Sequence, residues 1–458
     1  MFKRMFLLAS LVLFLVAAQS FAAVGVFDNA KDVGGPKGIG STVYEGYQWK
    51  DDPVLVEQYL LTGGGNDIWG SWDKFHYAYK ELSGDVRLTS SFEWVASNNG
   101  WAKMGVMMRD LANDGDAVHY SSVVRQGNDL VSFQRREGTG WGSGNSDVGG
   151  LPKPAFIKLG IQRVSVSGFP LVEAMYDIGA GWQQIGGPLI AWNLPDEVGL
   201  GVALTSHNND HLAQARVYDV TYEKGISLMS ELVTVPEDGA VQECPSDIPG
   251  FLIRSIKTRV TDGWGYDRMN EILDTGAIMG IPGYEEGKRV DPVVNVRDTG
   301  NGAFDDDRSF PGIDPYEYPA ADPAAGDDDN NFATEVLACI ELTAGAHMIG
   351  ASSDDGTIIW IGGVEIGRTG EWKGASNVDF LFTVAADGLY PLVARSLEGG
   401  GGASLELHEV LAQDDGSFKR VLLGDTEAGA SPVYVPEPAT IALLGFGGLA
   451  MLRIRKRG

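Results

Sequence analysis

Residues 86–94, VRLTSSFEW, alternate between apolar and polar side chains, and this alternation decides the fold class of the chain. In an extended strand, successive side chains point to opposite faces of the sheet. Val86, Leu88, Phe92 and Trp94 therefore share one face, and the polar residues between them share the other. The period of two predicts a β-strand that buries one face against a core.

The same alternation recurs through the first half of the chain. Further segments with this period are Met104 to Met108, Val131 to Phe133, Ile157 to Ile161, Leu171 to Tyr176, Leu200 to Leu204 and Ala215 to Val220. Turn signals such as Asn98-Asn99-Gly100 and Asn113-Asp114-Gly115 separate them. Helical periodicity is scarce, so these short strands predict an antiparallel β-sandwich over residues 24–224.

The second half of the chain contains another set of short apolar segments bounded by turns. The expected strands are Cys339 to Leu342, His347 to Ala351, Thr357 to Ile361, Phe380 to Val384, Leu389 to Arg395 and Ala403 to Glu409. They predict a second sandwich over residues 311–423. The predicted fold class is therefore all-β, with two antiparallel β-sandwich domains of the jelly-roll type.

Residues 225–310 lie between the two expected sandwiches. Pro236, Pro245 and Pro249 stand among acidic and small residues there, which predicts a linker followed by a partly ordered lead-in. Within the lead-in, Phe251 to Lys257 is expected to form a strand, and Asp267 to Leu273 is expected to form one short helix, because its apolar residues fall on one side.

The first residues of the chain form a targeting signal. Lys3 and Arg4 precede an apolar run from Met5 to Ala18, and small residues suitable for cleavage follow at Ser20-Phe21-Ala22. This order predicts a secretory signal peptide over residues 1–22.

The last residues, 435–458, form a second targeting signal with three parts. The first part is Pro436, Glu437 and Pro438, and the last part is the basic group Arg453, Arg455, Lys456 and Arg457. The apolar run Ala439 to Leu452 between them is shorter than the roughly 20 residues that span a bilayer comfortably. We therefore expect a short membrane-sorting helix that spans temporarily, with its basic end in the cytoplasm.

This three-part tail resembles the PEP-CTERM sorting signal of Gram-negative bacteria. The resemblance implies that an exosortase-type membrane enzyme recognises and cleaves the tail after transient anchoring in the inner membrane. It also implies that the rest of the protein reaches the cell surface or the extracellular polymer layer.

Charge and cysteine content narrow the functional classes. The formal net charge is -27, and it becomes more negative once both targeting ends are removed, because they hold six basic residues and one acidic residue. Such an acidic protein is not expected to bind nucleic acid or an anionic membrane through its overall field. In an exported protein the only two cysteines, Cys244 and Cys339, could form one disulfide.

The first expected sandwich resembles the concanavalin A-like jelly-roll modules of bacterial extracellular proteins. The residues that carry the resemblance include Asp67-Ile68-Trp69-Gly70, Trp101 to Arg109 and Gly199 to His207. The resemblance implies the fold and favours glycan binding. Trp141, in the glycine-rich stretch from Gly138 to Gly144, is the first candidate for stacking against a sugar ring.

No catalytic motif stands out in this domain. Glycoside hydrolases need two carboxylates across the scissile bond, and the Glu-x-Asp-x-x-Glu strand of the laminarinase-like members is missing. A Gly-x-Ser-x-Gly nucleophile turn is missing as well. We therefore expect a protein without catalytic residues, with a glycoside hydrolase as the less favoured alternative.

The second expected sandwich resembles the protective-antigen-type module of bacterial toxins, glycosidases and yeast flocculins. Ser353-Asp354-Asp355-Gly356-Thr357, Leu342 to His347 and Gly388 to Leu392 carry this resemblance. In the adhesin members, two adjacent aspartates at this turn bind Ca²⁺, which in turn holds sugar hydroxyls. Asp354 and Asp355 match those positions.

Two interpretations of the aspartate pair follow from that resemblance. Asp354 and Asp355 could hold Ca²⁺, since paired carboxylates at a tight turn supply the oxygen ligands that the ion prefers. Alternatively, as in members without calcium, the pair could accept hydrogen bonds from turn amides. Trp372, in the stretch from Glu371 to Asn377, is the candidate for sugar stacking near this turn.

These observations together predict a non-catalytic extracellular or cell-surface protein that binds polysaccharide. A structural matrix protein without a specific ligand is the alternative from a different functional class.

Overall fold

The computed structural model describes residues 24–35, 40–45, 47–48, 55–127, 130–152, 156–241, 244, 246–257, 265–275, 285–298, 303–313, 331–413 and 417–436. The expected signal peptide and membrane-sorting helix lie outside these residues. Within them, no helix has both the length and the apolar character needed to cross a membrane. The chain divides into two compact units, with the boundary between Ser230 and Glu231. Both units are built from β-sheets, which confirms the predicted fold class.

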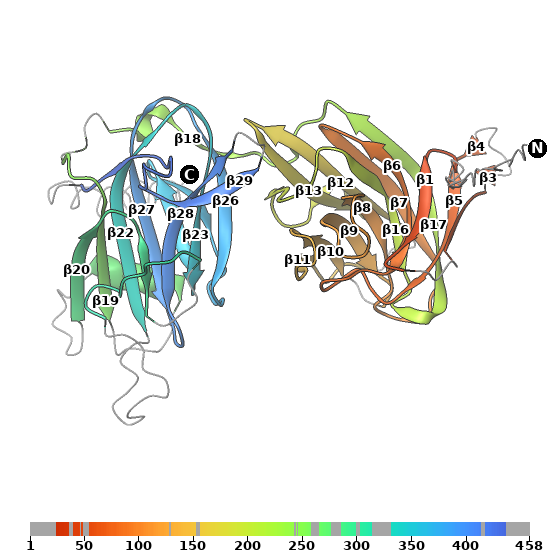
Figure 1. Cartoon of the computed structure of the whole chain (residues 1–458), viewed down its shortest axis with the longest axis horizontal. Coiled ribbons are helices and arrows are strands. Elements are labelled where there is room, and N and C mark those ends of the chain that lie inside the picture. Colours follow the sequence, from red (N-terminus) through yellow and green to blue (C-terminus); the bar gives the residue numbers. More distant parts are fainter. Residues whose placement is uncertain are drawn as a thin grey trace, which may run out of the picture. The chain divides into compact units, whose positions relative to one another are not determined.

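The first unit contains a seven-stranded antiparallel sheet (Figure 1). Its strands, in spatial order, are β1 (Asn29–Val33), β6 (Phe75–Leu82), β16 (Val198–Thr205), β8 (Lys103–Arg109), β9 (His119–Arg125), β10 (Val131–Arg136) and β11 (Gly144–Val148).

An eight-stranded antiparallel sheet forms the other layer of this unit. Its strands, in spatial order, are β14 (Gln183–Gln184), β13 (Phe169–Asp177), β12 (Ile157–Val166), β7 (Val86–Ala96), β17 (Asn208–Lys224), β5 (Gln58–Gly65) and β2 (Ser41–Tyr44), with β15 (Leu189–Ile190) also paired to β13. A separate two-stranded sheet joins β3 (Tyr47–Gln48) and β4 (Leu55–Val56).

Strand β7 shows why the two layers pack against each other. β7 buries Val86, Leu88 and Phe92 in the core between the sheets, and Trp94 is partly buried against the same core. Each fully buried side chain of this size contributes about 1.5–3 kcal/mol to stability. The polar positions between them face away from the core, so the predicted alternation is confirmed in this strand.

The second unit contains a six-stranded sheet and a seven-stranded sheet. The six-stranded sheet consists of β18 (Val233–Val235), β26 (Ser376–Val384), β23 (Gly345–Asp354), β28 (Ser404–Ala412) and β21 (Asn295–Arg297), with β29 (Phe418–Leu422) also paired to β28. The seven-stranded sheet consists of β20 (Glu285–Asp291), β19 (Phe251–Lys257), β22 (Phe332–Leu342), β27 (Gly388–Glu398), β24 (Thr357–Ile361) and β25 (Val364–Arg368), with β30 (Val433–Tyr434) also paired to β22. β18 and β26 run parallel, whereas the other paired strands of the unit run antiparallel.

The structure places part of the expected linker inside this second sandwich. Strands β18 to β21 all come from residues 225–310, and β19 pairs with β20 on one side and β22 on the other. Phe251 and Ile253 of β19 are fully buried in the core. The second unit therefore starts near Glu231 rather than at residue 311, and it continues past residue 423 to β30.

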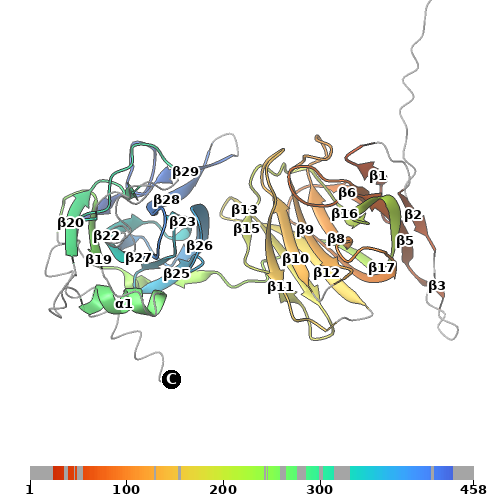
Figure 2. The same ribbon diagram turned by 90° about the horizontal axis from the view of Figure 1, so that it is seen from below.

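The predicted short helix is confirmed as α1 (Tyr266–Thr275). It buries Met269, Ile272 and Leu273 against one face of the seven-stranded sheet (Figure 2). These residues lie on one side of the helix, as their spacing predicts. A short 3-10 turn, η1 (Glu237–Gly239), follows β18.

The first unit encloses a cluster of buried charges. Asp73 has no exposed surface, and its Oδ2 accepts hydrogen bonds from Arg109 Nη1 at 2.8 Å and Arg136 Nη1 at 2.6 Å. Its Oδ1 accepts a third from Arg136 Nη2 at 2.7 Å. Burial alone would raise the pKa of Asp73, but the neighbouring His119 and the two guanidinium groups hold it below its usual value. One carboxylate thus compensates two buried arginines.

The substitution Asp73→Asn tests this cluster. We expect it to lower the free energy of unfolding of the first unit by about 3–5 kcal/mol, because it leaves two buried guanidinium groups without a counter-charge. Urea denaturation of the full chain measures the loss. The matched control, Glu223→Gln, removes the partner of Arg87 in an exposed ion pair of the same unit and should cost less than about 1 kcal/mol. Equal losses for the two variants would contradict the prediction.

Candidate metal centre

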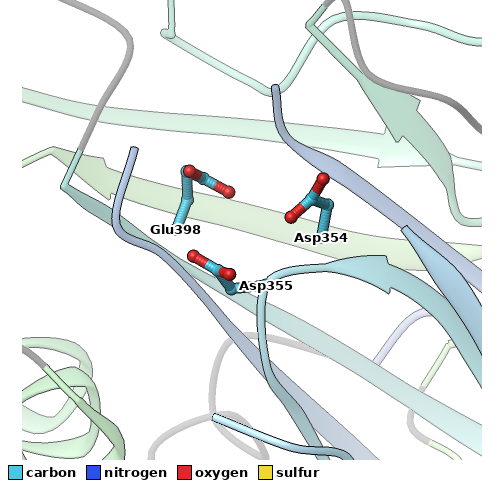
Figure 3. A group of neighbouring side chains, drawn as sticks. All are labelled: Asp354, Asp355 and Glu398. Carbon is cyan, nitrogen blue, oxygen red and sulfur yellow. The ribbon is translucent and has the colours of Figure 1, made fainter. Parts of the chain in front are cut away.

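Three carboxyl groups of the second unit converge on one point (Figure 3). Asp354 is the last residue of β23, Asp355 lies in the turn that follows, and Glu398 is the last residue of β27. One oxygen from each lies within 4.8 Å of the others. β23 and β27 belong to different sheets, so the group forms where the chain crosses from one layer to the other.

The residues around the aspartates hold this turn in place. Ser353 Oγ donates a hydrogen bond to the carbonyl oxygen of Asp355 at 2.8 Å. Gly356 has no room for a side chain, since an added Cβ would lie 2.6 Å from the hydroxyl oxygen of Tyr266. The first and last residues of the Ser-Asp-Asp-Gly motif, Ser353 and Gly356, therefore each have a structural role in the turn. The peptide bond between Asp354 and Asp355 is cis.

The carboxylate of Asp355 also accepts hydrogen bonds from two backbone amides. The N–H of Lys373 donates to Oδ1 and that of Gly399 donates to Oδ2, each at 3.1 Å. Asp355 is 8% exposed, and it thus joins the turn to two other segments of the unit. These contacts are the turn-amide hydrogen bonds of the second interpretation, whereas Asp354, the first aspartate of the pair, is less buried than Asp355.

Glu398 is the most unusual member of the group. It is 1% exposed, and its Oε1 accepts a hydrogen bond from the N–H of Gly400 at 2.6 Å. Its Oε2 has no hydrogen-bond partner among the described residues. Burial and the neighbouring Asp355 raise the pKa of Glu398 to about 9. Burial and Asp355 also raise the pKa of Asp354.

Lys373 is a cation that interacts with both aspartates of this group. Its Nζ donates hydrogen bonds to the backbone carbonyl oxygens of Ser353 and Ser376. Burial lowers the pKa of Lys373, whereas Asp354 and Asp355 act in the opposite direction. One lysine bonded to carbonyl groups does not balance three carboxyl groups, so the site favours a further positive charge.

Trp372 lies at the edge of the same site. Its side chain is 54% exposed, and an added Cβ on Gly399 would lie 2.3 Å from its Cζ3 atom. The indole ring therefore lies against the backbone next to Glu398. The structure brings together three residues predicted from the sequence, namely Asp354, Asp355 and Trp372.

Trp141 belongs to the first unit and forms a separate candidate. It is 58% exposed, and its ring lies against Gly138, where an added Cβ would be 2.3 Å from its Cδ2 atom. Its backbone oxygen accepts a hydrogen bond from Arg136 Nε at 3.1 Å. An exposed ring with a fixed backbone remains suited to stacking against a ligand.

The structure leaves Cys244 and Cys339 as free thiols, so the expected disulfide is not formed in it. Cys339 is buried in β22, and Cys244 is partly buried with its Sγ 3.9 Å from the backbone oxygen of Tyr434. Burial and a hydrogen bond with the Cys244 thiol raise the pKa of Cys339. The two thiols are therefore neighbours, although they are 95 positions apart in the sequence.

Glu398 was not predicted from the sequence as a member of the acidic group. Glu398 directly precedes four glycines, 399–402, which mark a turn and give no sign of a ligand. Its position depends on the pairing of β27 with β24, in which Ser396 lies opposite Thr357. That pairing brings the end of β27 to the Asp354–Asp355 turn, and strand pairing cannot be inferred from this one sequence.

The C-terminal tail matches the family model of the PEP-CTERM protein-sorting motif over residues 435–457. The predicted sorting signal is thus confirmed, and such a motif indicates export to the cell surface. Of the tail residues named above, Pro436 is described by the structure, whereas Glu437, Pro438 and the four basic residues lie outside the described part. No curated protein is significantly similar to this chain in sequence.

Solved structures similar to parts of the chain have low sequence identity. A PA14 sugar-binding domain from an RTX adhesin has 14% identity and a TM-score of 0.28, covering 38% of this chain and 96% of its own. The alginate lyase A1-II', of polysaccharide lyase family 7, has 10% identity and a TM-score of 0.27, covering 39% and 84%. The Epithelial Adhesin 9 A domain from Candida glabrata has 9% identity and a TM-score of 0.26, covering 45% and 96%.

Oxidation tests the proximity of the two thiols. We expect an intramolecular disulfide between Cys244 and Cys339 when the protein is exported to an oxidising compartment, because the two thiols interact in the folded chain. Alkylation of the unfolded protein, followed by mass spectrometry, should find no free thiol before reduction and two after it. The variant Cys244→Ser should leave one free thiol. Two free thiols in the unreduced exported protein would contradict the prediction.

Proposed function

We propose that this protein is a non-catalytic cell-surface protein that binds polysaccharide through Ca²⁺ held by Asp354, Asp355 and Glu398. The observation that carries the proposal is the buried Glu398, whose Oε2 has no hydrogen-bond partner among the described residues. Burying a charged oxygen without a partner is costly unless a cation or a proton meets it. A hard divalent ion that prefers carboxylate oxygens fits this need.

The spacing of the three carboxyl groups suits calcium. Calcium–oxygen distances are about 2.3–2.6 Å, so oxygens on opposite sides of the ion are about 4.6–5.2 Å apart. The carboxylate oxygens of the three acids lie within 4.8 Å of one another, which falls within that range. When bound, calcium would supply further coordination positions for sugar hydroxyls, since it takes about 6–8 oxygen ligands.

Trp372 would contribute the apolar part of such a site. Its exposed indole lies beside the acidic group, and a sugar ring offers an apolar face for stacking. Asp354 is the least buried of the three acids, so ligand would approach from its side. The chain's own residues would thus hold the cation, orient the sugar and shield the buried carboxylate from water.

The burial of the acids also argues against a hydrolase at this site. A glycoside hydrolase places two carboxyl groups on either side of a bond that the substrate brings between them. Glu398 and Asp355 are 1% and 8% exposed, so a glycosidic bond cannot reach both. A hydrolase therefore ranks below a binding protein, and a matrix protein without a specific ligand is the second candidate.

Delivery is the other part of the proposal. The PEP-CTERM tail would be cleaved by an exosortase-type enzyme after transient anchoring in the inner membrane of a Gram-negative bacterium. The processed protein would then act at the cell surface or in the extracellular polymer layer.

The variant Asp355→Asn tests the calcium-dependent site. We expect isothermal titration calorimetry on the full chain to show calcium binding that this variant weakens by tenfold or more, since one charged ligand is lost; a tenfold loss corresponds to about 1.4 kcal/mol. A glycan array should show a set of glycans that bind only with calcium, and the variant and a chelator should both abolish this calcium-dependent binding.

The matched control is Glu427→Gln, which removes an exposed carboxylate from the same unit. It should bind calcium and glycans like the natural protein. Calcium binding without any glycan binding would favour the matrix protein. If Asp355→Asn bound calcium as tightly as the control, the proposed centre would be abandoned.

The raised pKa of Glu398 predicts a dependence on pH. The pKa rises from 4.5 to about 9 on folding, so across that interval the folded protein holds a proton that the unfolded chain has lost. Without calcium, this group therefore makes stability fall as the pH rises from about 4.5 to about 9. Scanning calorimetry with a chelator should show this fall, and Glu398→Gln should reduce it. Calcium should oppose the fall most strongly at high pH, where no proton competes for the carboxylate.

A further inference from the structure

The eight-stranded sheet of the first unit carries a hollow on the face that points away from the core. Its volume is about 760 Å³. The lining comes from five strands and their ends, and comprises Gln58, Ser91, Phe156, Lys158, Asp177, Ile178, Gly179, Arg216, Tyr218 and Asp219. The hollow lies within one unit, and nothing in the calcium site contributes to it.

The strand register places four of these residues in one row. Lys158 of β12 lies opposite Ser91 of β7, Ser91 lies opposite Tyr218 of β17, and Tyr218 lies opposite Gln58 of β5. Neighbouring strands are about 4.8 Å apart, so the row is about 14 Å long. It therefore offers a continuous track of polar side chains across four strands, which is long enough for a short oligosaccharide.

A pair of aromatic rings, one exposed and one partly buried, forms one wall of this track. Phe156 precedes β12 and is 52% exposed, and its ring meets Tyr218 edge-on with the ring centroids 5.7 Å apart. The hydroxyl group of Tyr218 donates a hydrogen bond to Glu93 Oε2 at 2.9 Å, which fixes the ring. A half-exposed phenylalanine adds little to folding, but it gives a ligand an apolar surface that is already in position.

Polar groups with unused hydrogen-bonding capacity lie beside the rings. Arg216 Nε is buried and has no hydrogen-bond partner among the described residues, although Glu45 Oε2 lies 3.8 Å away. Lys158 is exposed at the head of the row and has no ion pair among the residues that the structure describes. Lys158 and the exposed part of the Arg216 side chain can therefore donate hydrogen bonds to a ligand, whereas the buried Nε is out of its reach.

A β-bulge adds an acceptor to the same hollow. The pairing of β17 with β7 shifts between Tyr218 and Thr221, and Asp219 adopts a left-handed conformation with φ of 51°. Bulges of this kind turn a side chain away from its regular direction. Asp219 Oδ2 accepts a hydrogen bond from Ser91 Oγ at 3.4 Å, so the carboxylate is held at the lining.

We propose that this hollow is a second saccharide-binding site, which takes a neutral oligosaccharide without calcium. The aromatic pair would stack against sugar rings, whereas Lys158, Arg216 and Asp219 would bind hydroxyl groups. The lining includes two basic and two acidic side chains, so it does not favour a strongly charged polymer. The site goes beyond the proposed function because it needs neither the second unit nor a metal ion.

The test measures binding of neutral and acidic oligosaccharides to the full chain in the presence of a chelator. We expect a neutral oligosaccharide to bind the natural protein and the Asp355→Asn variant equally. Phe156→Ala should weaken this binding by roughly tenfold or more, as truncation of an aromatic anchor does. The control Trp101→Ala removes another aromatic side chain, 53% exposed, that does not line the hollow, and it should bind normally.

Each outcome separates this site from the calcium site. Binding that requires calcium would support the proposed function and overturn the second site. Binding with chelator that Phe156→Ala leaves unchanged would also overturn it, provided that the melting temperatures of the variants agree. Preferential binding of acidic oligosaccharides would overturn the proposal that the ligand is neutral. Chelator-resistant binding lost only in Phe156→Ala would support the hollow even if the calcium site failed its own test.

Discussion

The chemistry of the second unit depends on one constraint, which is that three carboxyl groups share a buried corner. Two like charges about 4 Å apart repel by about 4 kcal/mol at an effective dielectric constant of 20. Three such charges cannot all persist without compensation, so the corner must hold a proton, an internal cation or a bound cation. Lys373 Nζ is bonded to the carbonyl groups of Ser353 and Ser376, which leaves a proton or a bound cation to compensate Glu398.

The two units resolve buried charge in opposite ways. In the first unit Asp73 meets Arg109 and Arg136 at hydrogen-bonding distance, and both guanidinium groups also donate to backbone carbonyl oxygens. In the second unit the acids come from two sheets, and no arginine is bonded to them among the described residues. A cluster of opposite charges bonded to one another stabilises the fold around it, whereas a buried carboxylate oxygen without a partner creates affinity for something outside the chain. This contrast is why only the second cluster is interpreted as a binding site.

The sequence allowed the strands and the aspartate pair to be predicted, but not the contacts between distant strands. Alternation revealed β7 because its apolar residues repeat every second position. Glu398 was missed because its place near Asp355 depends on the register of β27 with β24. Of the strands within 225–310, β19 was predicted over Phe251 to Lys257, whereas β18, β20 and β21 were missed because prolines and acidic residues dominate that stretch. Local sequence patterns thus predicted strands and turns, whereas the pairing between strands determines which of these strands and turns lie together.

Two saccharide sites of different chemistry would give the chain a graded response to its surroundings. A site built on carboxylates depends on calcium and on pH, because a proton and the ion compete for Glu398. A site built on Phe156 and Tyr218, with Lys158, Arg216 and Asp219 beside them, does not depend on calcium. When both engage one polymer, the second contact forms at a high effective concentration, so weak individual sites can still give durable attachment. Loss of calcium would then weaken attachment to the polymer layer without abolishing it, which suits a surface protein that meets changing ionic conditions.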